Sequence, residues 1–207
     1  MSHAYSTYKE MIQLLQYQSY LNLEDDEALR KQWVFKCPLH ALWLEPLFEN
    51  FSDARIIVCH RNMKNSIPSL ASLLTTCQSM YEGNKFIRLD LIGKSVMDFV
   101  SFCAGKIEGS QSKESISSVT CHVRYNDLEK DPINTIKTIY KRFGLRFTAD
   151  YEQNLVEQIK YDLSERHKRS NGGVLHNYSL KTFSLSEEEI DRIFRGYHKK
   201  YFSDEIY

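Results

Sequence analysis

The chain has 207 residues, of which 27 are Lys or Arg and 27 are Asp or Glu, so its formal net charge is zero. This length predicts a single domain over residues 1–207, and a hydrophobic content of 42% suffices for a folded core. The balanced charge gives no support for bulk nucleic-acid binding, which needs a basic surface. No apolar run is long enough to span a bilayer, so we expect no membrane span in this sequence.

The cysteines bear on the compartment. The chain has five, and no two of them form a Cys-x-x-Cys pair. This pattern argues against a disulfide framework or a zinc site and favours a reducing compartment. We therefore expect a cytoplasmic protein, with the Golgi lumen as the alternative if a membrane anchor precedes residue 1.

Helices and short strands alternate along the first half of the chain. Apolar residues at helical spacing predict helices over residues 5–20, 39–50, 66–81 and 90–104. Short apolar runs containing Val, Ile, Phe and Cys predict buried strands over residues 33–36 and 54–60.

A third strand is predicted in the second half, over residues 118–125. The Ser- and Gly-rich segment before it, residues 106–118, is predicted to be a mobile loop. Further helices are predicted from the Asp131-Pro132 cap to Phe143, over residues 148–163 and over residues 186–201, with the basic residues 164–178 irregular. Strands alternating with helices predict an α/β fold, with a parallel sheet flanked by helices.

The end of the second predicted strand is the most informative part of the sequence. The strand is expected to end at His60 and Arg61, and a helix is expected to begin at Ser66. Such a junction is where α/β folds bind anions. Arg61 supplies a permanent cation whose forked donors suit phosphate, and Ser69 offers a hydroxyl to the same anion. For the pair alone, a solvated Arg and a helix-start Ser are the alternative.

Several short motifs accompany this junction. Arg-x7-Ser after a buried strand resembles the 3′-phosphate-binding element of sulfotransferases that use 3′-phosphoadenosine 5′-phosphosulfate (PAPS). Five further segments resemble that family's motifs W-x-L-K-S-P-x-H, F-P-D-A-R, V-R-Y-E-D-L-x-x-D-P, R-F-G-L and H-x-Y-S-L-x-x-F, in the same order along the chain. They are residues 33–40 (WVFKCPLH), 51–55 (FSDAR), 123–132 (VRYNDLEKDP), 142–145 (RFGL) and 176–183 (HNYSLKTF).

One element of the family has no counterpart in the sequence. The family opens with a strand, a P-[KR]-S-G-T-T-type loop that holds the 5′-phosphosulfate, and a helix. Gly93-Lys94-Ser95 does not replace this loop, because a Walker loop would need Gly where Arg88 stands. The sequence thus resembles the C-terminal part of a P-loop-like sulfotransferase core that lacks the first strand, loop and helix. We expect little sulfuryl transfer by these residues alone.

The resemblance assigns roles to individual residues. Arg61 and Ser69 match the ligands of the 3′-phosphate, and Tyr125 matches a Tyr that lies against the adenine, with a strand-end core Tyr as the alternative. Lys36 is the candidate cation near the bridging oxygen, and His40 is the candidate base. Cytosolic relatives have Lys-x-His where this chain has Lys-x-x-x-His, so a helix-start histidine is the alternative for His40.

The C-terminal basic loop supplies further candidates. Relatives use this region to close over the nucleotide phosphates, which points to Arg169, His176 and Tyr178 as PAPS-binding residues. A solvated charged loop is the alternative reading.

The implied reaction moves a sulfuryl group from PAPS to an acceptor hydroxyl or amine, with no metal. The acceptor would be a small molecule or a glycan, bound by variable segments at residues 79–85 and 106–117. The alternative is an inactive remnant that binds a nucleotide or a partner chain. A sheet without its inner strand would leave an unpaired apolar edge, which predicts self-association.

Overall fold

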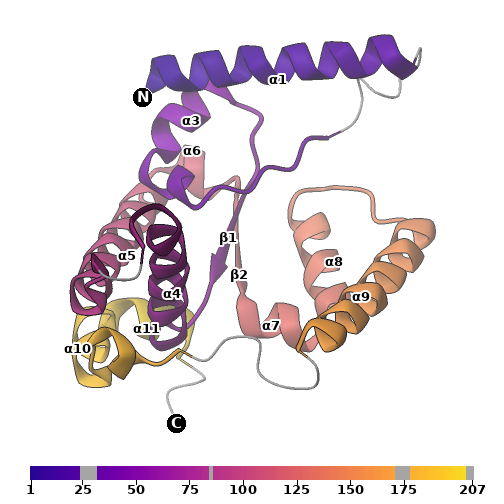
Figure 1. The fold of residues 1–207 in the computed structure, drawn as a ribbon. Helices are drawn as coiled ribbons and strands as arrows, with labels where there is room; N and C mark the ends of the chain where they lie inside the picture. Colours follow the sequence, from indigo (N-terminus) through magenta and orange to yellow (C-terminus); the bar gives the residue numbers. More distant parts are fainter. Residues whose placement is uncertain (24–31, 84–85, 171–177, 204–207) are drawn as a thin grey trace. The chain divides into compact units, whose positions relative to one another are not determined.

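The computed structural model of the chain describes residues 1–23, 32–83, 86–170 and 178–203 (Figure 1). These residues form two compact units, of which the first joins Met1–Ile56 to Cys103–Thr120 and the second joins Ile57–Phe102 to Cys121–Tyr207. The single domain inferred from chain length stays a prediction. None of the described helices combines the length and apolar character that crossing a bilayer requires.

The first unit is built on the N-terminal helix α1, Ser2–Leu23, as the sequence predicts. Tyr5 and Ile12, two turns apart on α1, are buried with Leu44 and Ile116. The other elements of this unit are η1 (Pro38–Leu42), α3 (Leu44–Asn50), the C-terminal part of α5 (Leu89–Gln111) and α6 (Glu114–Ser117).

The strand predicted at residues 33–36 is wrong. Residues 32–37 take no regular secondary structure and are exposed, with 89% of Val34 open to solvent. Apolar strand propensity needs a neighbouring strand for its hydrogen bonds and packing. The helix predicted at residues 39–50 is divided into η1 and α3, because Trp43 has non-helical dihedral angles (φ −139°, ψ 45°).

The loop predicted at residues 106–118 is also wrong. Helix α5 continues to Gln111, and α6 follows after a short turn. The serines that signalled a loop satisfy their hydroxyls within the chain: Ser110 Oγ donates to the Ile107 carbonyl at 2.8 Å, and Ser112 Oγ to the Gly109 carbonyl at 2.6 Å. The bond of Ser110 accompanies a serine inside α5, whereas Ser112 lies in the turn after the helix.

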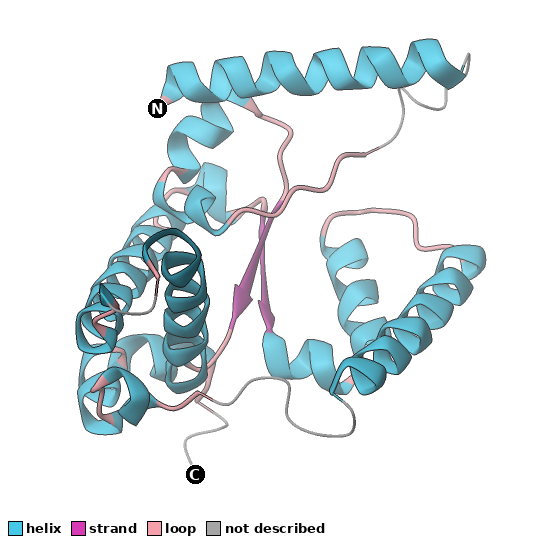
Figure 2. Ribbon diagram, in the orientation of Figure 1, coloured by secondary structure: helices cyan, strands magenta, loops and turns pink. Residues whose placement is uncertain are grey.

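Two parallel strands, β1 (Ile56–His60) and β2 (Thr120–Arg124), form the sheet (Figure 2). Both lie within segments that the sequence predicts as strands, residues 54–60 and 118–125, and among the described residues the strand predicted at residues 33–36 has no counterpart. The fold is therefore a mostly helical α/β fold with a small parallel sheet, which confirms the predicted class.

The other regular elements among the described residues of the second unit are helices. The cap predicted for α8, Pro132–Arg142, is confirmed: Asp131 accepts a hydrogen bond from the Asn134 amide at 3.1 Å. The predicted helix at residues 186–201 is interrupted at Phe194, which has φ −101° and ψ 17°. The elements are the N-terminal part of α5, α4 (Met63–Glu82), α7 (Tyr125–Lys130), α8 (Pro132–Arg142), α9 (Ala149–Ser170), η3 (Leu180–Phe183), α10 (Glu187–Ile193) and α11 (Arg195–Tyr201).

Part of the C-terminal segment predicted as irregular is helical. Residues 164–170 continue α9 to Ser170. Residues 171–177 lie outside the described residues.

Gly93 gives a test of packing. A Cβ at this position of α5 would clash with the Phe183 carbonyl oxygen and would lie 2.8 Å from the Phe183 Cβ. We expect Gly93→Ala to lower the free energy of unfolding by about 1–3 kcal/mol through overpacking. At Gly105 in the same helix nothing lies within 4 Å, so Gly105→Ala should raise the free energy by about 0.5–1 kcal/mol. Urea unfolding of both variants measures this, and effects of the same sign would contradict it.

Candidate functional site

The junction between β1 and α4 is built around Asn62. The Asn62 side chain accepts the Lys64 amide at 3.0 Å and caps α4, which begins at Met63. The helix therefore starts three residues before Ser66, where the sequence predicts its start. Ser69 consequently lies in the second turn of α4 and not at the helix start.

Every amide of the first turn of α4 has a partner inside the protein. The Met63 amide donates to His198 Nε2 at 3.3 Å, and the Lys64 amide donates to the Asn62 side chain. The amides of Asn65 and Ser66 both donate to the Asn62 carbonyl at 3.0 Å. These amides are thus engaged, and binding of an anion at this junction would depend on side chains.

Arg61 and Tyr125 meet at this junction. The Arg61 guanidinium carbon lies 4.7 Å from the centre of the Tyr125 ring, within range of a cation–π contact. Arg61 directly follows β1 and Tyr125 directly follows β2, so the carboxyl ends of two adjacent parallel strands bring them together (Figure 1). Among the described residues no carboxylate forms a salt bridge with Arg61. The junction therefore carries a positive charge beside an aromatic ring.

Ser69 lies on α4, further along the helix than the junction with β1. It is half-buried and lies about 9 Å along the axis from Met63, at 1.5 Å per residue. For Ser69 and Arg61 to hold one phosphate, the long Arg61 side chain must extend along α4 toward Ser69. Its role as a phosphate ligand stays a prediction.

His60, the last residue of β1, is the centre of a cluster that the sequence analysis missed. Its Nδ1 lies 2.9 Å from the Tyr197 hydroxyl, and its Nε2 lies 2.8 Å from His122 Nδ1. The Tyr201 ring stacks on the His60 ring at 3.7 Å. Burial, with smaller contributions from His122 and Lys200, lowers the pKa of His60 to about 4. The spacing of the two tyrosines, four apart on one helix, was the only sequence signal for this cluster.

In the first unit, His40 pairs with Tyr5. His40 Nδ1 lies 2.9 Å from the Tyr5 hydroxyl, and Tyr5 is 5% exposed. Burial lowers the pKa of His40 below its usual 6.5, so the ring is neutral near pH 7. Tyr5 is thus a partner that can fix the tautomer of His40. Lys36 is exposed in residues 32–37, which have no regular secondary structure.

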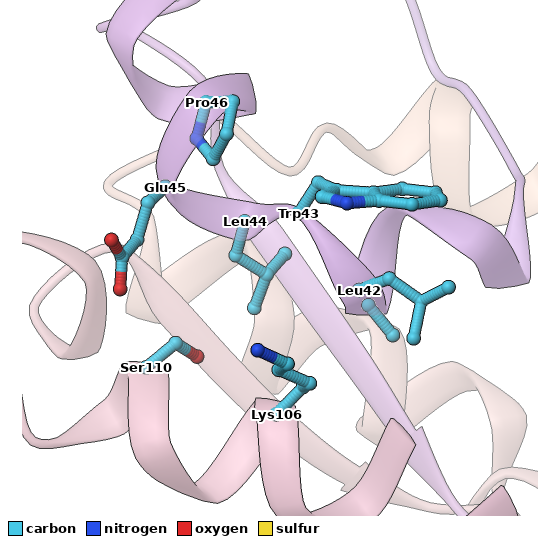
Figure 3. Close-up of a pocket in the computed structure, with 8 residues that line it drawn as sticks. Leu42, Trp43, Leu44, Glu45, Pro46, Lys106 and Ser110 are labelled. Carbon is cyan, nitrogen blue, oxygen red and sulfur yellow. The ribbon is translucent and has the colours of Figure 1, made fainter. Parts of the chain in front are cut away.

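A small pocket lies beside the residues that follow His40. Its volume is about 230 Å³, and Figure 3 shows Lys106 and Ser110 of α5 facing Leu44 and Glu45 of α3. Glu45 forms a salt bridge with Lys113 at 2.8 Å. Lys106 and Ser110 belong to the segment predicted to contact the acceptor. The lining residues are Ala41, Leu42, Trp43, Leu44, Glu45, Pro46, Lys106 and Ser110.

The C-terminal candidates are described only in part. Arg169 lies in the last turn of α9, but its side chain is outside the description, as is all of His176. Tyr178 is half-buried. Their predicted contacts with nucleotide phosphates stay predictions.

Comparisons with known proteins show the family of the chain. A model of the sulfotransferase family matches residues 3–149, a range that includes Lys36, His40, Arg61, Ser69 and Tyr125. The chain belongs to the sulfotransferase family. A comparison with curated proteins found no match.

Two solved structures share the fold. Sulfotransferase STF9 from Mycobacterium avium has a TM-score of 0.70 and 22% identity, over 83% of this chain and 42% of that chain. Sulfotransferase STF1 from Mycobacterium tuberculosis H37Rv has a TM-score of 0.64 and 28% identity, over 82% of this chain and 41% of that chain. The chain thus spans less than half the length of these two proteins.

His40 provides a test of the first unit. Because burial lowers its pKa, we expect its imidazole to titrate below pH 6.5 in the folded chain and at about 6.5 in urea. The folded state then binds fewer protons than the unfolded state near pH 6, so this group lowers the free energy of unfolding as the pH falls through 6.5. NMR titration of the His40 ring measures both states. A folded-state pKa of 6.5 or higher would contradict the geometry.

Proposed function

We propose that this chain is the part of a PAPS-dependent sulfotransferase that binds the 3′-phosphoadenosine end of the donor. The full protein would transfer the sulfuryl group to the hydroxyl or amine of a small molecule or a glycan. Family membership and the fold support the reaction class, and the residues at the β1–α4 junction support the choice of donor.

The observation that carries the proposal is the contact between Arg61 and Tyr125. A nucleotide with a 3′-phosphate needs an anion ligand and an aromatic surface close together. Arg61 offers a permanent charge with five donors, and it has no carboxylate partner among the described residues to neutralise it. Tyr125 offers the ring. Arg61 and Tyr125 were assigned from two motifs more than 60 residues apart, and the two side chains contact each other.

The proposed chemistry assigns two residues of the first unit. When bound, PAPS supplies the sulfuryl group. His40 would take the proton of the acceptor hydroxyl as its oxygen bonds to sulfur, and Lys36 would stabilise the charge on the bridging oxygen that leaves with the nucleotide. As in phosphoryl transfer, positioning and charge stabilisation would supply most of the rate.

The Tyr5 contact sets a condition on this role. A neutral imidazole carries one proton, so His40 can act as a base at Nε2 only if Nδ1 bears that proton and donates it to the Tyr5 oxygen. Tyr5 would then hold the tautomer that leaves Nε2 able to accept. A hydrogen bond in the opposite direction, from the Tyr5 hydroxyl to Nδ1, would place the proton on Nε2 and remove the base.

Binding of 3′-phosphoadenosine 5′-phosphate tests the donor assignment. We expect the chain to bind this nucleotide and Arg61→Ala to weaken binding by about 2 kcal/mol, roughly 30-fold, through loss of a charge-assisted contact. Titration calorimetry measures the dissociation constants.

The matched control is Arg88→Ala. It removes the same charge from an exposed side chain that pairs with Asp90 at 2.8 Å, and it should leave the affinity unchanged. Equal affinities for wild type and Arg61→Ala would contradict the assignment. Equal losses of affinity in Arg61→Ala and Arg88→Ala would contradict it too.

A further inference from the structure

Helix α11 contacts the chain on both sides of Arg61. The Tyr197 hydroxyl bonds His60, the residue before Arg61. His198 Nε2 accepts the amide of Met63, two residues after Arg61, in a buried hydrogen bond. The Tyr201 ring covers His60 at 3.7 Å. One helix therefore holds both ends of the short turn that carries Arg61.

We propose that Tyr197 and His198 are positioning residues that hold Arg61 in place for the nucleotide phosphate, and that protonation of His198 releases this hold. The proposal rests on the function proposed above, but the holding of the turn can be tested without nucleotide. Neither residue belongs to a motif of the family resemblance.

The hydrogen bond from Met63 specifies one form of His198. A ring nitrogen that accepts an amide proton cannot carry a proton itself, so Nε2 is bare and the neutral ring is protonated at Nδ1. A proton on Nε2 would remove the acceptor and leave the buried Met63 amide without its partner. Such a loss typically costs more than the bond is worth when made. The contact can exist only while His198 is neutral.

Two charged groups on neighbouring elements face His198. Asp191 of α10 has its Oδ1 3.9 Å from His198 Nδ1, which favours the charged ring, and Lys64 of α4 opposes it. Lys64 is itself held by Asp191 at 2.8 Å and by Glu187 at 3.1 Å. Burial is the largest effect and lowers the pKa of His198 below 6.5. The ring is therefore neutral near pH 7 and gains a proton on acidification.

The other end of the turn favours neutral rings too. His60 Nε2 and His122 Nδ1 lie 2.8 Å apart, and a hydrogen bond between them needs one nitrogen without a proton. Besides the Tyr197 hydroxyl, Lys200 and Tyr201 of α11 face this pair, and the Lys200 charge opposes protonation of both histidines. The pair can take one proton and keep its bond, but a second would break it. The contact at this end can therefore survive the first protonation, with His60 Nδ1 donating to the Tyr197 oxygen, whereas the Met63 contact is lost as soon as His198 Nε2 gains a proton.

His198→Gln and His198→Ala test the proposal. The Gln side chain can place its oxygen near the position of Nε2 and accept the Met63 amide at any pH, whereas Ala cannot accept it. At pH 7.5 we expect His198→Ala to bind 3′-phosphoadenosine 5′-phosphate about five- to tenfold more weakly than wild type, and His198→Gln to bind within about twofold. Circular dichroism confirms that each variant is folded.

The pH profile separates positioning from general stability. Titration of the nucleotide phosphates is common to both proteins, so the ratio of wild-type to His198→Gln affinity is the readout. This ratio should fall as the pH drops below 6.5. In parallel, the Met63 amide resonance in nucleotide-free protein should titrate with His198 in wild type and stay constant in His198→Gln.

The outcomes are distinct. A Met63 amide with the same pH dependence in wild type and His198→Gln would overturn the proposal. If wild type binds the nucleotide, a ratio of wild-type to His198→Gln affinity that does not change with pH would overturn the proposal as well. If wild type binds no nucleotide, the proposed function fails, and the Met63 amide alone decides whether α11 holds the turn.

Discussion

The turn from β1 into α4 is the constraint on which the second unit depends. A strand that ends in a helix exposes the helix's first amides, and these need acceptors if they are buried. Asn62 supplies two of these acceptors and His198 of α11 supplies another. Satisfying the backbone in this way leaves the Arg61 side chain to meet Tyr125 at the ends of the two strands. The geometry of the candidate site follows from the capping of one helix.

Charge is arranged around this turn in two ways. Arg61 carries a guanidinium, whose charge and forked donors suit a ligand of phosphate. The three histidines near it, His60, His122 and His198, all have pKa values lowered by burial. Neutral rings can accept hydrogen bonds and do not add cost to a buried site. In the proposed function, the Arg61 cation binds the phosphate and the neutral histidines hold the backbone that carries Arg61.

The sequence predicted the elements whose evidence is local. The strand before Arg61, the Asp131 cap and the α1 helix all match observed elements, although β1 is not buried as predicted, because Ile57 and Cys59 are exposed. Motif spacing brought Arg61 and Tyr125 into one hypothesis. Prediction from sequence failed where strand formation depends on a neighbouring strand: residues 33–36 are apolar enough for a strand but pair with none among the described residues.

The contacts of α11 were beyond prediction for a related reason. His60 and Tyr197 are 137 positions apart, and no periodicity relates them. The helix at residues 106–111 was missed because Ser110 bonds to the nearby Ile107 carbonyl, which composition does not reveal.

The central claim is that the carboxyl ends of β1 and β2 bind the 3′-phosphoadenosine group. A crystal structure of the chain with 3′-phosphoadenosine 5′-phosphate tests it most directly. The account predicts the 3′-phosphate within hydrogen-bond distance of the Arg61 guanidinium and the adenine against the Tyr125 ring. A nucleotide bound elsewhere, with Arg61 and Tyr125 making no contact to it, would contradict the account.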